Sequence, residues 1–121
     1  MAQLAKGALP KLMLEFSFEK RRNAARKLQH NHPGMILLVI DSPHFVFEKT
    51  KFIVEPDKKI WELVFDIKKS GNIDYKTPIV PITYSGIVPP NSWTVAQLYH
   101  QHYSRDGFLY LKILKTDSAY G

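Results

Sequence analysis

The strongest periodic pattern in the chain lies in the stretch DKKIWELVFDIKK, residues 57–69. Four apolar residues recur there at the i, i+3, i+4 and i+7 positions of one helical face: Ile60, Leu63, Val64 and Ile67. Asp57 at the start and Lys68 and Lys69 at the end suit the helix dipole, which favours negative charge at the N-terminus and positive charge at the C-terminus. The pattern predicts a helix over this stretch.

Two further helices are predicted before residue 33. The short stretch ALPKLMLEF, residues 8–16, is broken near Pro10, and Ser17 can cap the next helix, FEKRRNAARKLQHNH, residues 18–32. The apolar residues of this second helix form two narrow stripes: Phe18 with Ala25, and Ala24 with Leu28. Such stripes suggest a helix laid over a surface.

Four apolar stretches read as strands. MILLVI (35–40) is a continuous apolar run, which suits a strand covered on both faces. KFIV (51–54) is the second strand, and FLYLKIL (108–114) is the last. Two prolines in PIVPITYSG (78–86) place that strand at a sheet edge, because proline cannot donate a ladder hydrogen bond.

A T-x-x-Q capping box, Thr94 with Gln97, starts a helix over VAQLYHQHY, residues 95–103. The predicted order is therefore helix, helix, strand, strand, helix, strand, helix, strand. This order predicts an α+β fold with a four-stranded mixed sheet, in which the ββα…β core is the ubiquitin-like β-grasp arrangement.

Composition limits the classes of protein that fit. A chain of 121 residues that is 45% hydrophobic fits one domain with one core. The absence of cysteine excludes disulfides, thiolate zinc sites and a catalytic thiol. No apolar run reaches the ~20 residues of a membrane span, and Lys6, Pro10 and Lys11 interrupt the first stretch where a signal peptide needs an apolar core. We expect a soluble, cytosolic protein.

The net charge of +6 is concentrated near the start of the chain. Residues 1–30 hold seven Lys and Arg against two Glu, a net +5, while residues 31–121 hold ten against nine acidic residues, a net +1. The predicted basic surface comprises Lys20, Arg21, Arg22 and Arg26. It could favour nucleic acid, acidic proteins or anionic membrane, or it could be a solvated helix face.

Candidate chemistry in the side chains is sparse. The pairs His30/His32 and His100/His102 point ~200° apart on a helix, so we expect no metal site. There is no nucleophile elbow or phosphate loop, so we expect no catalytic residues and no cofactor. Most of the aromatic residues fall at positions typical of a core, which weakens an RNA-binding interpretation: Phe18, Phe52, Trp61, Phe65, Phe108 and Tyr110.

Three stretches together resemble the autophagy ubiquitin-like modifiers of the GABARAP and microtubule-associated protein light chain type. They are FEKRRNAARKLQHNHP, KFIVEPDKKIWELVFDIKK and IVPPNSWTVAQLYHQHYSRDGFLYLKILKTDSAYG, so the resemblance covers nearly the whole chain from Phe16. It implies a ubiquitin-like fold with two added N-terminal helices on the sheet face opposite the other helices. We expect a single domain over residues 1–121, with a helical extension (1–32), a ubiquitin-like core (33–114) and a flexible tail (115–121).

The resemblance also implies a modifier that is covalently attached to a membrane lipid. The C-terminal glycine, here Gly121, would be activated as a thioester on an activating and a conjugating enzyme and then joined to phosphatidylethanolamine. A glycine suits this role because it has no Cβ to obstruct a narrow active site. The implied location is the cytoplasm, and the autophagosome membrane after lipidation. We expect a monomer. If residues follow Gly121 before maturation, a processing protease is a further expected partner.

The second implied activity is capture of cargo receptors through short aromatic-x-x-aliphatic peptides, which add to the edge of strand 51–54. By position, the aromatic pocket would involve Leu28, Leu37, Lys51, Ile53 and Phe108. The aliphatic pocket would involve Phe52, Val54 and Leu63, and acidic flanks of the peptide would meet Lys49, Lys51 and Lys58.

The chain also departs from the family pattern. Met35 stands for an arginine, Ala24 for an acidic residue, Glu55 for a proline, and Lys58 and Asp66 for aliphatic residues beside the second pocket. From eight residues of helical rise, ~12 Å, we expect Lys58 and Asp66 to be too far apart to neutralise each other. Two other interpretations remain open: a sister modifier joined to a protein lysine, and a basic binding module for tubulin or RNA without conjugation.

Overall fold

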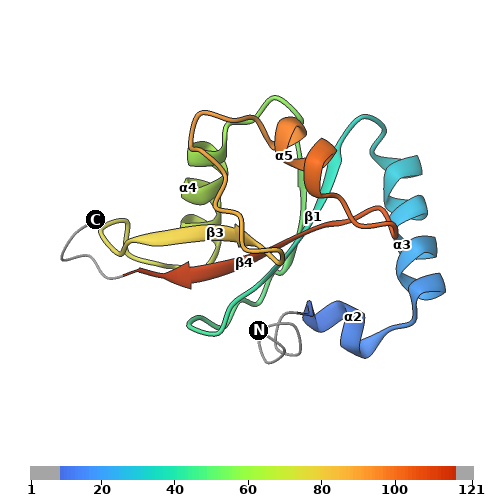
Figure 1. Ribbon diagram of the computed structural model, residues 1–121, viewed down its shortest axis with the longest axis horizontal. Coiled ribbons are helices and arrows are strands. Elements are labelled where there is room, and N and C mark those ends of the chain that lie inside the picture. The colour runs from blue at the N-terminus through green and yellow to red at the C-terminus, as the bar shows by residue number, and fades with distance from the viewer. Residues whose placement is uncertain (1–8, 117–121) are drawn as a thin grey trace.

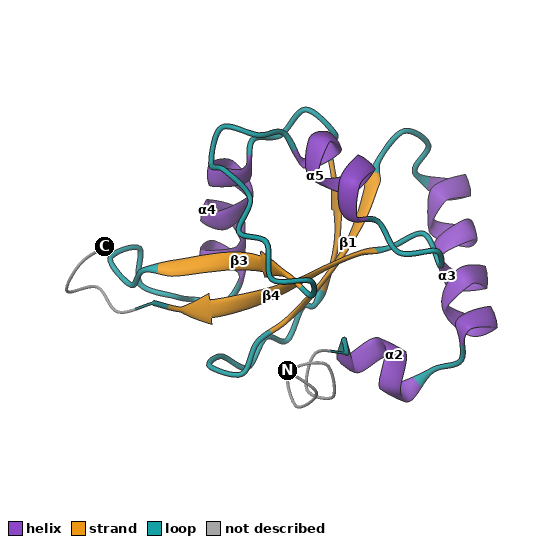
Figure 2. Cartoon of the chain, viewed as in Figure 1, coloured by secondary structure: helices purple, strands orange, loops and turns teal. Residues whose placement is uncertain are grey.

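The computed structural model describes residues 9–116, and its four strands form one mixed sheet in the order β2-β1-β4-β3. Figure 2 draws the strands in orange. The strands are β1 (Ile36–Asp41), β2 (Lys51–Val54), β3 (Ile79–Thr83) and β4 (Leu109–Lys115). β1 lies parallel to β4 and antiparallel to β2, and β3 lies antiparallel to β4. The predicted mixed four-stranded sheet is confirmed.

The helices are α2 (Lys11–Glu15), α3 (Phe18–Asn31), α4 (Ile60–Ser70) and α5 (Val95–His102). Together with the strands they follow the predicted order. α4 and α5 pack on one face of the sheet and α3 on the other, and Figure 1 shows α3 away from α4 and α5, with α2 leading into it. The expected placement of the N-terminal helices opposite the other two is confirmed.

Strand β1 is buried on both faces, as its continuous apolar run predicts. Leu38 and Ile40 belong to a large apolar cluster with α4 and α5, whereas Leu37 and Val39 belong to a smaller cluster with Ala25 of α3. Successive side chains of a strand point to opposite faces. The sheet therefore separates two cores.

The helix starts agree with the sequence in two cases and differ in one. The Ser17 hydroxyl accepts a bond from the Lys20 N–H, and the Thr94–Gln97 capping box is present. However, α4 begins at Ile60, where the Lys59 N–H donates to the Glu62 carboxylate. Asp57 therefore lies before the helix, so the prediction that it stands at the helix start is wrong. Glu62 supplies the acidic charge of the first turn instead.

The exposed aromatic residues correct another expectation. Phe52, Phe108 and Tyr110 are buried, but Phe18 is exposed, and Trp61 and Phe65 are 58% and 57% exposed. On α4 the buried residues are Ile60, Leu63 and Ile67, and Trp61 and Phe65 lie on the outer face. The prediction of a core position is therefore wrong for three of the six aromatic residues, Phe18, Trp61 and Phe65.

β3 lies at a sheet edge, as its prolines predict. Pro81 stands opposite Ile113 of β4, where antiparallel partners need not exchange a bond. The carbonyl of Ile113 accepts its bond from the Ser42 hydroxyl, on the side of β1. Proline is tolerated at position 81 because no backbone N–H is needed there to bond to β4.

Candidate functional site

β2 forms the other edge of the sheet and separates the two groups of predicted peptide-binding residues. Its side chains alternate, with Lys51 and Ile53 exposed and Phe52 and Val54 buried. The buried pair joins the large core, and Ile53 lies directly opposite Leu37 on the other face. A ligand along this edge would meet both faces of the sheet.

The predicted aliphatic group comes together in space. A hollow of about 340 Å³ lies between β2 and α4. Its lining includes all three residues of the predicted group, and three lysines with one carboxylate: Lys49, Phe52, Ile53, Val54, Lys58, Leu63, Asp66, Lys69 and Ser70. The hollow has an apolar floor and a mainly cationic rim.

Lys58 and Asp66 form an ion pair, so the expectation that they lie too far apart is wrong. Lys58 precedes α4, and its four-carbon side chain reaches along the helix towards Asp66. The predicted separation counted only the rise of the backbone and not the length of this side chain. The hydrogen bond to Asp66 raises the pKa of the Lys58 ammonium. Lys49 stands over the Phe52 ring with its nitrogen 4.6 Å from the centroid. Charged side chains therefore border this hollow.

The predicted aromatic group is only partly accessible. Leu37 and Phe108 are 2% and 1% exposed, because they form the small core together with Tyr110 and Ala25. Leu28 of α3 is half-buried against that core. Of this group, Leu28, Lys51 and Ile53 present surface to a ligand, while the other two support them from beneath.

The predicted basic surface loses one member. Lys20, Arg22 and Arg26 are exposed, but the Arg21 side chain is only 11% exposed and pairs with the fully buried Asp106 carboxylate at 2.9 Å. Arg21 also donates to the Phe16 carbonyl at 2.8 Å. The prediction that Arg21 belongs to the basic surface is wrong, because its guanidinium is buried against Asp106. No local signal in the sequence indicates this partner, which lies 85 residues away.

Asp106 is the centre of a polar cluster that the sequence analysis missed. Besides Arg21 it accepts the Phe108 N–H at 3.0 Å and the Tyr110 hydroxyl at 2.6 Å. Burial, reinforced by the bond to Asp106, raises the pKa of the Tyr110 phenol. Next to it, a Cβ on Gly107 would lie 3.1 Å from that of Ala25, and its φ of +102° favours glycine. The turn and α3 thus pack closely around one carboxylate.

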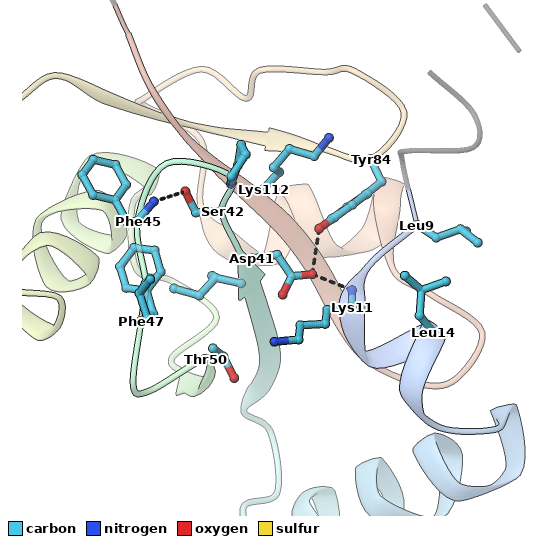
Figure 3. Close-up of a pocket in the computed structure, with 13 residues that line it drawn as sticks. Leu9, Lys11, Leu14, Asp41, Ser42, Phe45, Phe47, Thr50, Tyr84 and Lys112 are labelled. Atoms are coloured by element: carbon cyan, nitrogen blue, oxygen red, sulfur yellow. Dashed lines mark hydrogen bonds between the residues drawn. The ribbon is translucent and has the colours of Figure 1, made fainter. Parts of the chain in front are cut away.

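A second missed carboxylate anchors α2. Figure 3 shows Asp41 at the end of β1, accepting the Lys11 N–H and the Tyr84 hydroxyl, each at 2.8 Å. Burial and this bond raise the pKa of the Tyr84 phenol. The surrounding hollow, about 420 Å³, lies between α2 and the loop after β1. A polar residue directly after an unbroken apolar strand was the available signal.

Within residues 9–116, no three His, Asp or Glu side chains gather closely enough to hold a metal ion. No helix of that range is both long and apolar enough to cross a membrane. Gly121, the predicted conjugation point, lies outside the described residues. The last described residue, Thr116, donates its N–H to the Pro78 carbonyl at 3.0 Å.

Two known proteins are similar to this chain in sequence. Autophagy-related protein 8 of Schizosaccharomyces pombe is 29% identical over 101 residues, which cover 80% of this chain and 83% of that protein. The protein of the same name from Neosartorya fischeri is 26% identical, with 80% and 85% covered.

Solved structures share the fold. The crystal structure of Trypanosoma brucei ATG8 matches with a TM-score of 0.81 at 23% identity, over 91% of this chain and 99% of that one. Plasmodium falciparum Atg8 in complex with a Plasmodium falciparum Atg3 peptide matches with a TM-score of 0.75 at 25% identity, over 87% and 95%. The predicted ubiquitin-like fold with N-terminal helices is confirmed.

The family model for "Autophagy protein Atg8 ubiquitin like" matches residues 20–121, which is most of the chain. The identities to these individual relatives are low, between 23% and 29%. The chain belongs to the Atg8 family of ubiquitin-like autophagy proteins, as a distant member.

Proposed function

We propose that this chain is a lipid-conjugated autophagy modifier that captures short peptides at the β2 edge. Atg8-family proteins are ubiquitin-like modifiers and not enzymes. The observation that carries the peptide-binding part is the hollow between β2 and α4, which gathers Phe52, Val54 and Leu63 beside an open strand edge. We also propose one domain over residues 1–121, with a helical extension, core and tail divided at residues 32 and 114.

Conjugation would proceed through the carboxylate of Gly121. The activating enzyme first joins the carboxylate to AMP from ATP, with release of pyrophosphate, and a thiol of that enzyme then displaces AMP to form a thioester. A thiol of the conjugating enzyme accepts the acyl group from the first thioester. The amine of phosphatidylethanolamine finally attacks this second thioester, forms the amide and releases the thiol. The family match runs to residue 121, which supports this role for the glycine. The modifier would be cytoplasmic before lipidation and bound to autophagosomal membranes afterwards.

The direct experiment is reconstitution. The chain is incubated with ATP, an activating and conjugating enzyme pair of the family and phosphatidylethanolamine vesicles, and the products are weighed by mass spectrometry. We expect a lipid adduct that disappears when Gly121 is deleted. An adduct formed by the deletion variant would contradict conjugation at this residue, and an adduct on a protein lysine would favour the sister modifier.

Peptide capture would use β-strand addition at β2, with one anchor on each face of the sheet. Leu28, Lys51 and Ile53 would meet the aromatic anchor, and Phe52, Val54 and Leu63 the aliphatic one. The Plasmodium Atg8 structure contains an Atg3 peptide, which supports a peptide of the corresponding partner as one ligand here, beside cargo receptors.

Charge at the rim should change the balance between the two anchors. Lys58 and Asp66 replace apolar contact area with an ion pair, and burial of an aliphatic side chain is worth about 1.5–3 kcal/mol when complete. We therefore propose that the aromatic anchor dominates and that acidic flanks meet Lys49, Lys51 and Lys58. Calorimetric titration of one peptide and its two single-alanine variants tests this order. A larger loss from the aliphatic than from the aromatic substitution would contradict it.

The exposed cations Lys20, Arg22 and Arg26 favour one competing function, a basic module without conjugation. Binding to tubulin or RNA through this surface would weaken steeply with salt and would not depend on Gly121. The same reconstitution, repeated with a salt series, separates the two functions.

A further inference from the structure

The end of strand β4 is held from two sides, by different means. On one side β3 pairs with β4 as far as Lys115, and the Pro78 carbonyl accepts the N–H of Thr116. On the other side β1 ends at Asp41, opposite Lys112, so the ladder between these two strands stops three residues earlier. Ile113 and Lys115 therefore extend past the backbone of their neighbour.

Two side chains of the loop after β1 take the place of the missing strand. The Ser42 hydroxyl donates to the Ile113 carbonyl, and the His44 Nδ1 accepts the Lys115 N–H at 2.9 Å. Each bond joins residues 71 positions apart in the sequence. Together they continue the ladder on the side of β1 to the end of β4.

The loop is itself fixed by the same serine. Its oxygen accepts the N–H groups of His44 and Phe45 at 3.0 and 3.1 Å, and the second of these bonds is drawn in Figure 3. This local turn holds His44 next to β4 although its side chain is exposed. The bond to Lys115 requires an unprotonated Nδ1, which places the imidazole proton of the neutral ring on Nε2.

We infer that Ser42 and His44 are positioning residues for the C-terminal segment. The inference rests on the proposed conjugation at Gly121. Gly121 is the fifth residue after Thr116, and five residues span at most ~17 Å when extended. The point at which β4 is last held therefore decides where the reactive carboxylate can be delivered. Without the bonds from Ser42 and His44, the residues after Lys112 would be held by β3 alone, so they would separate from the sheet more readily and enlarge the volume that the end of the chain samples.

The test compares three variants of the full chain. His44→Ala removes the acceptor, whereas His44→Asn restores one, because the amide Oδ1 can occupy the place of Nδ1. His30→Ala removes an exposed histidine from the last turn of α3 and serves as the control. Two quantities are measured: hydrogen exchange of the Lys115 amide by NMR, and kcat and KM for thioester formation with the activating enzyme.

We expect His44→Ala to speed Lys115 exchange about 2- to 10-fold, the range that corresponds to one net hydrogen bond. We expect kcat/KM to fall by a similar factor, mainly through KM, because the chemistry at the glycine is unchanged. His44→Asn should recover most of both, and His30→Ala should change neither.

Three results would overturn the inference at different levels. Unchanged exchange in His44→Ala means that the side chain does not hold β4. Faster exchange with unchanged kcat/KM means that the bond between His44 and Lys115 exists but does not position the C-terminal segment for the activating enzyme. The proposed function would then stand. Failure of the unmodified chain to form any thioester overturns the proposed function and this role with it.

Discussion

The two faces of the sheet are stabilised in different ways. The face covered by α4 and α5 carries a large apolar cluster of fourteen buried side chains, all hydrophobic. The face covered by α2 and α3 carries five, and two carboxylates, Asp41 and Asp106, reinforce it with hydrogen bonds. The first face resembles a self-sufficient core, whereas the second attaches added helices through a small core and specific polar contacts.

This difference locates the candidate site. The β2 edge lies where the faces meet, so Leu63 and Phe52 come from the large core and Leu28 and Ile53 flank the small one. A change in the large core should affect the whole molecule. A change in the polar contacts should affect the position of α2 and α3, and with them one half of the site.

The largest effect is expected from truncation in the large core. Ile67→Ala should lower the free energy of unfolding by about 2–5 kcal/mol, because the buried residue leaves a cavity. Denaturant unfolding measures the loss. Phe65→Ala on the exposed face of the same helix is the control and should cost much less, and equal losses would contradict the assignment of the two faces of α4.

The next effect compares two neighbouring arginines. Arg21→Glu should cost about 3 kcal/mol or more, because it sets a second carboxylate against the buried Asp106. Arg22→Glu, on the exposed surface, should change stability by less than about 0.5 kcal/mol. Thermal unfolding of the two variants separates them. Equal stability would show that Arg21 is as solvated as its neighbour.

A smaller effect is expected at the α2 anchor. Tyr84→Phe removes the hydroxyl that Asp41 accepts, worth about 1 kcal/mol, and leaves the Lys11 N–H as the remaining bond. Hydrogen exchange should quicken in α2 more than in α4. Tyr75→Phe, at an exposed tyrosine, is the matched control, and identical exchange in both variants would remove Asp41 from this role.

The smallest effect on stability is expected at the rim of the second hollow. Replacing Lys58 and Asp66 together by leucine removes a partly exposed ion pair, which contributes at most about 1 kcal/mol. The same double variant should bind an aliphatic-anchored peptide more tightly in a calorimetric titration. Unchanged affinity would show that the ion pair does not limit this hollow.

Much of the architecture was predictable because it depends on local patterns. The buried residues of α4, the caps at Ser17 and Thr94, and the edge position of β3 all follow from spacing or from proline chemistry. The candidate site was predictable by position for Phe52, Val54 and Leu63, which the fold brings to one hollow. Their role as a peptide-binding site stays a prediction.

Other features escaped the sequence because they depend on contacts between distant segments. Arg21 looks like its neighbours on α3 until Asp106, 85 residues away, is placed beside it. The helical rise predicted that Lys58 and Asp66 lie too far apart to interact, but the long side chain of Lys58 reaches the Asp66 carboxylate. Phe18 shares the hydrophobicity of core residues, and only the packing of α3 decided that it faces outward. By contrast, the spacing along α4 already places Trp61 and Phe65 away from the face of Ile60, Leu63 and Ile67.

The sequence by itself determined the order of elements, the mixed sheet and the family, since hydrophobic period, turn residues and caps act over a few neighbouring residues. Tertiary structure alone decided which charges are paired, that Phe18 is exposed and how β4 ends, with Ser42 and His44 replacing a strand. The physical reason is that a charge or a hydrogen-bond donor has its energy set by its partner and its burial, and both arise only when remote segments meet.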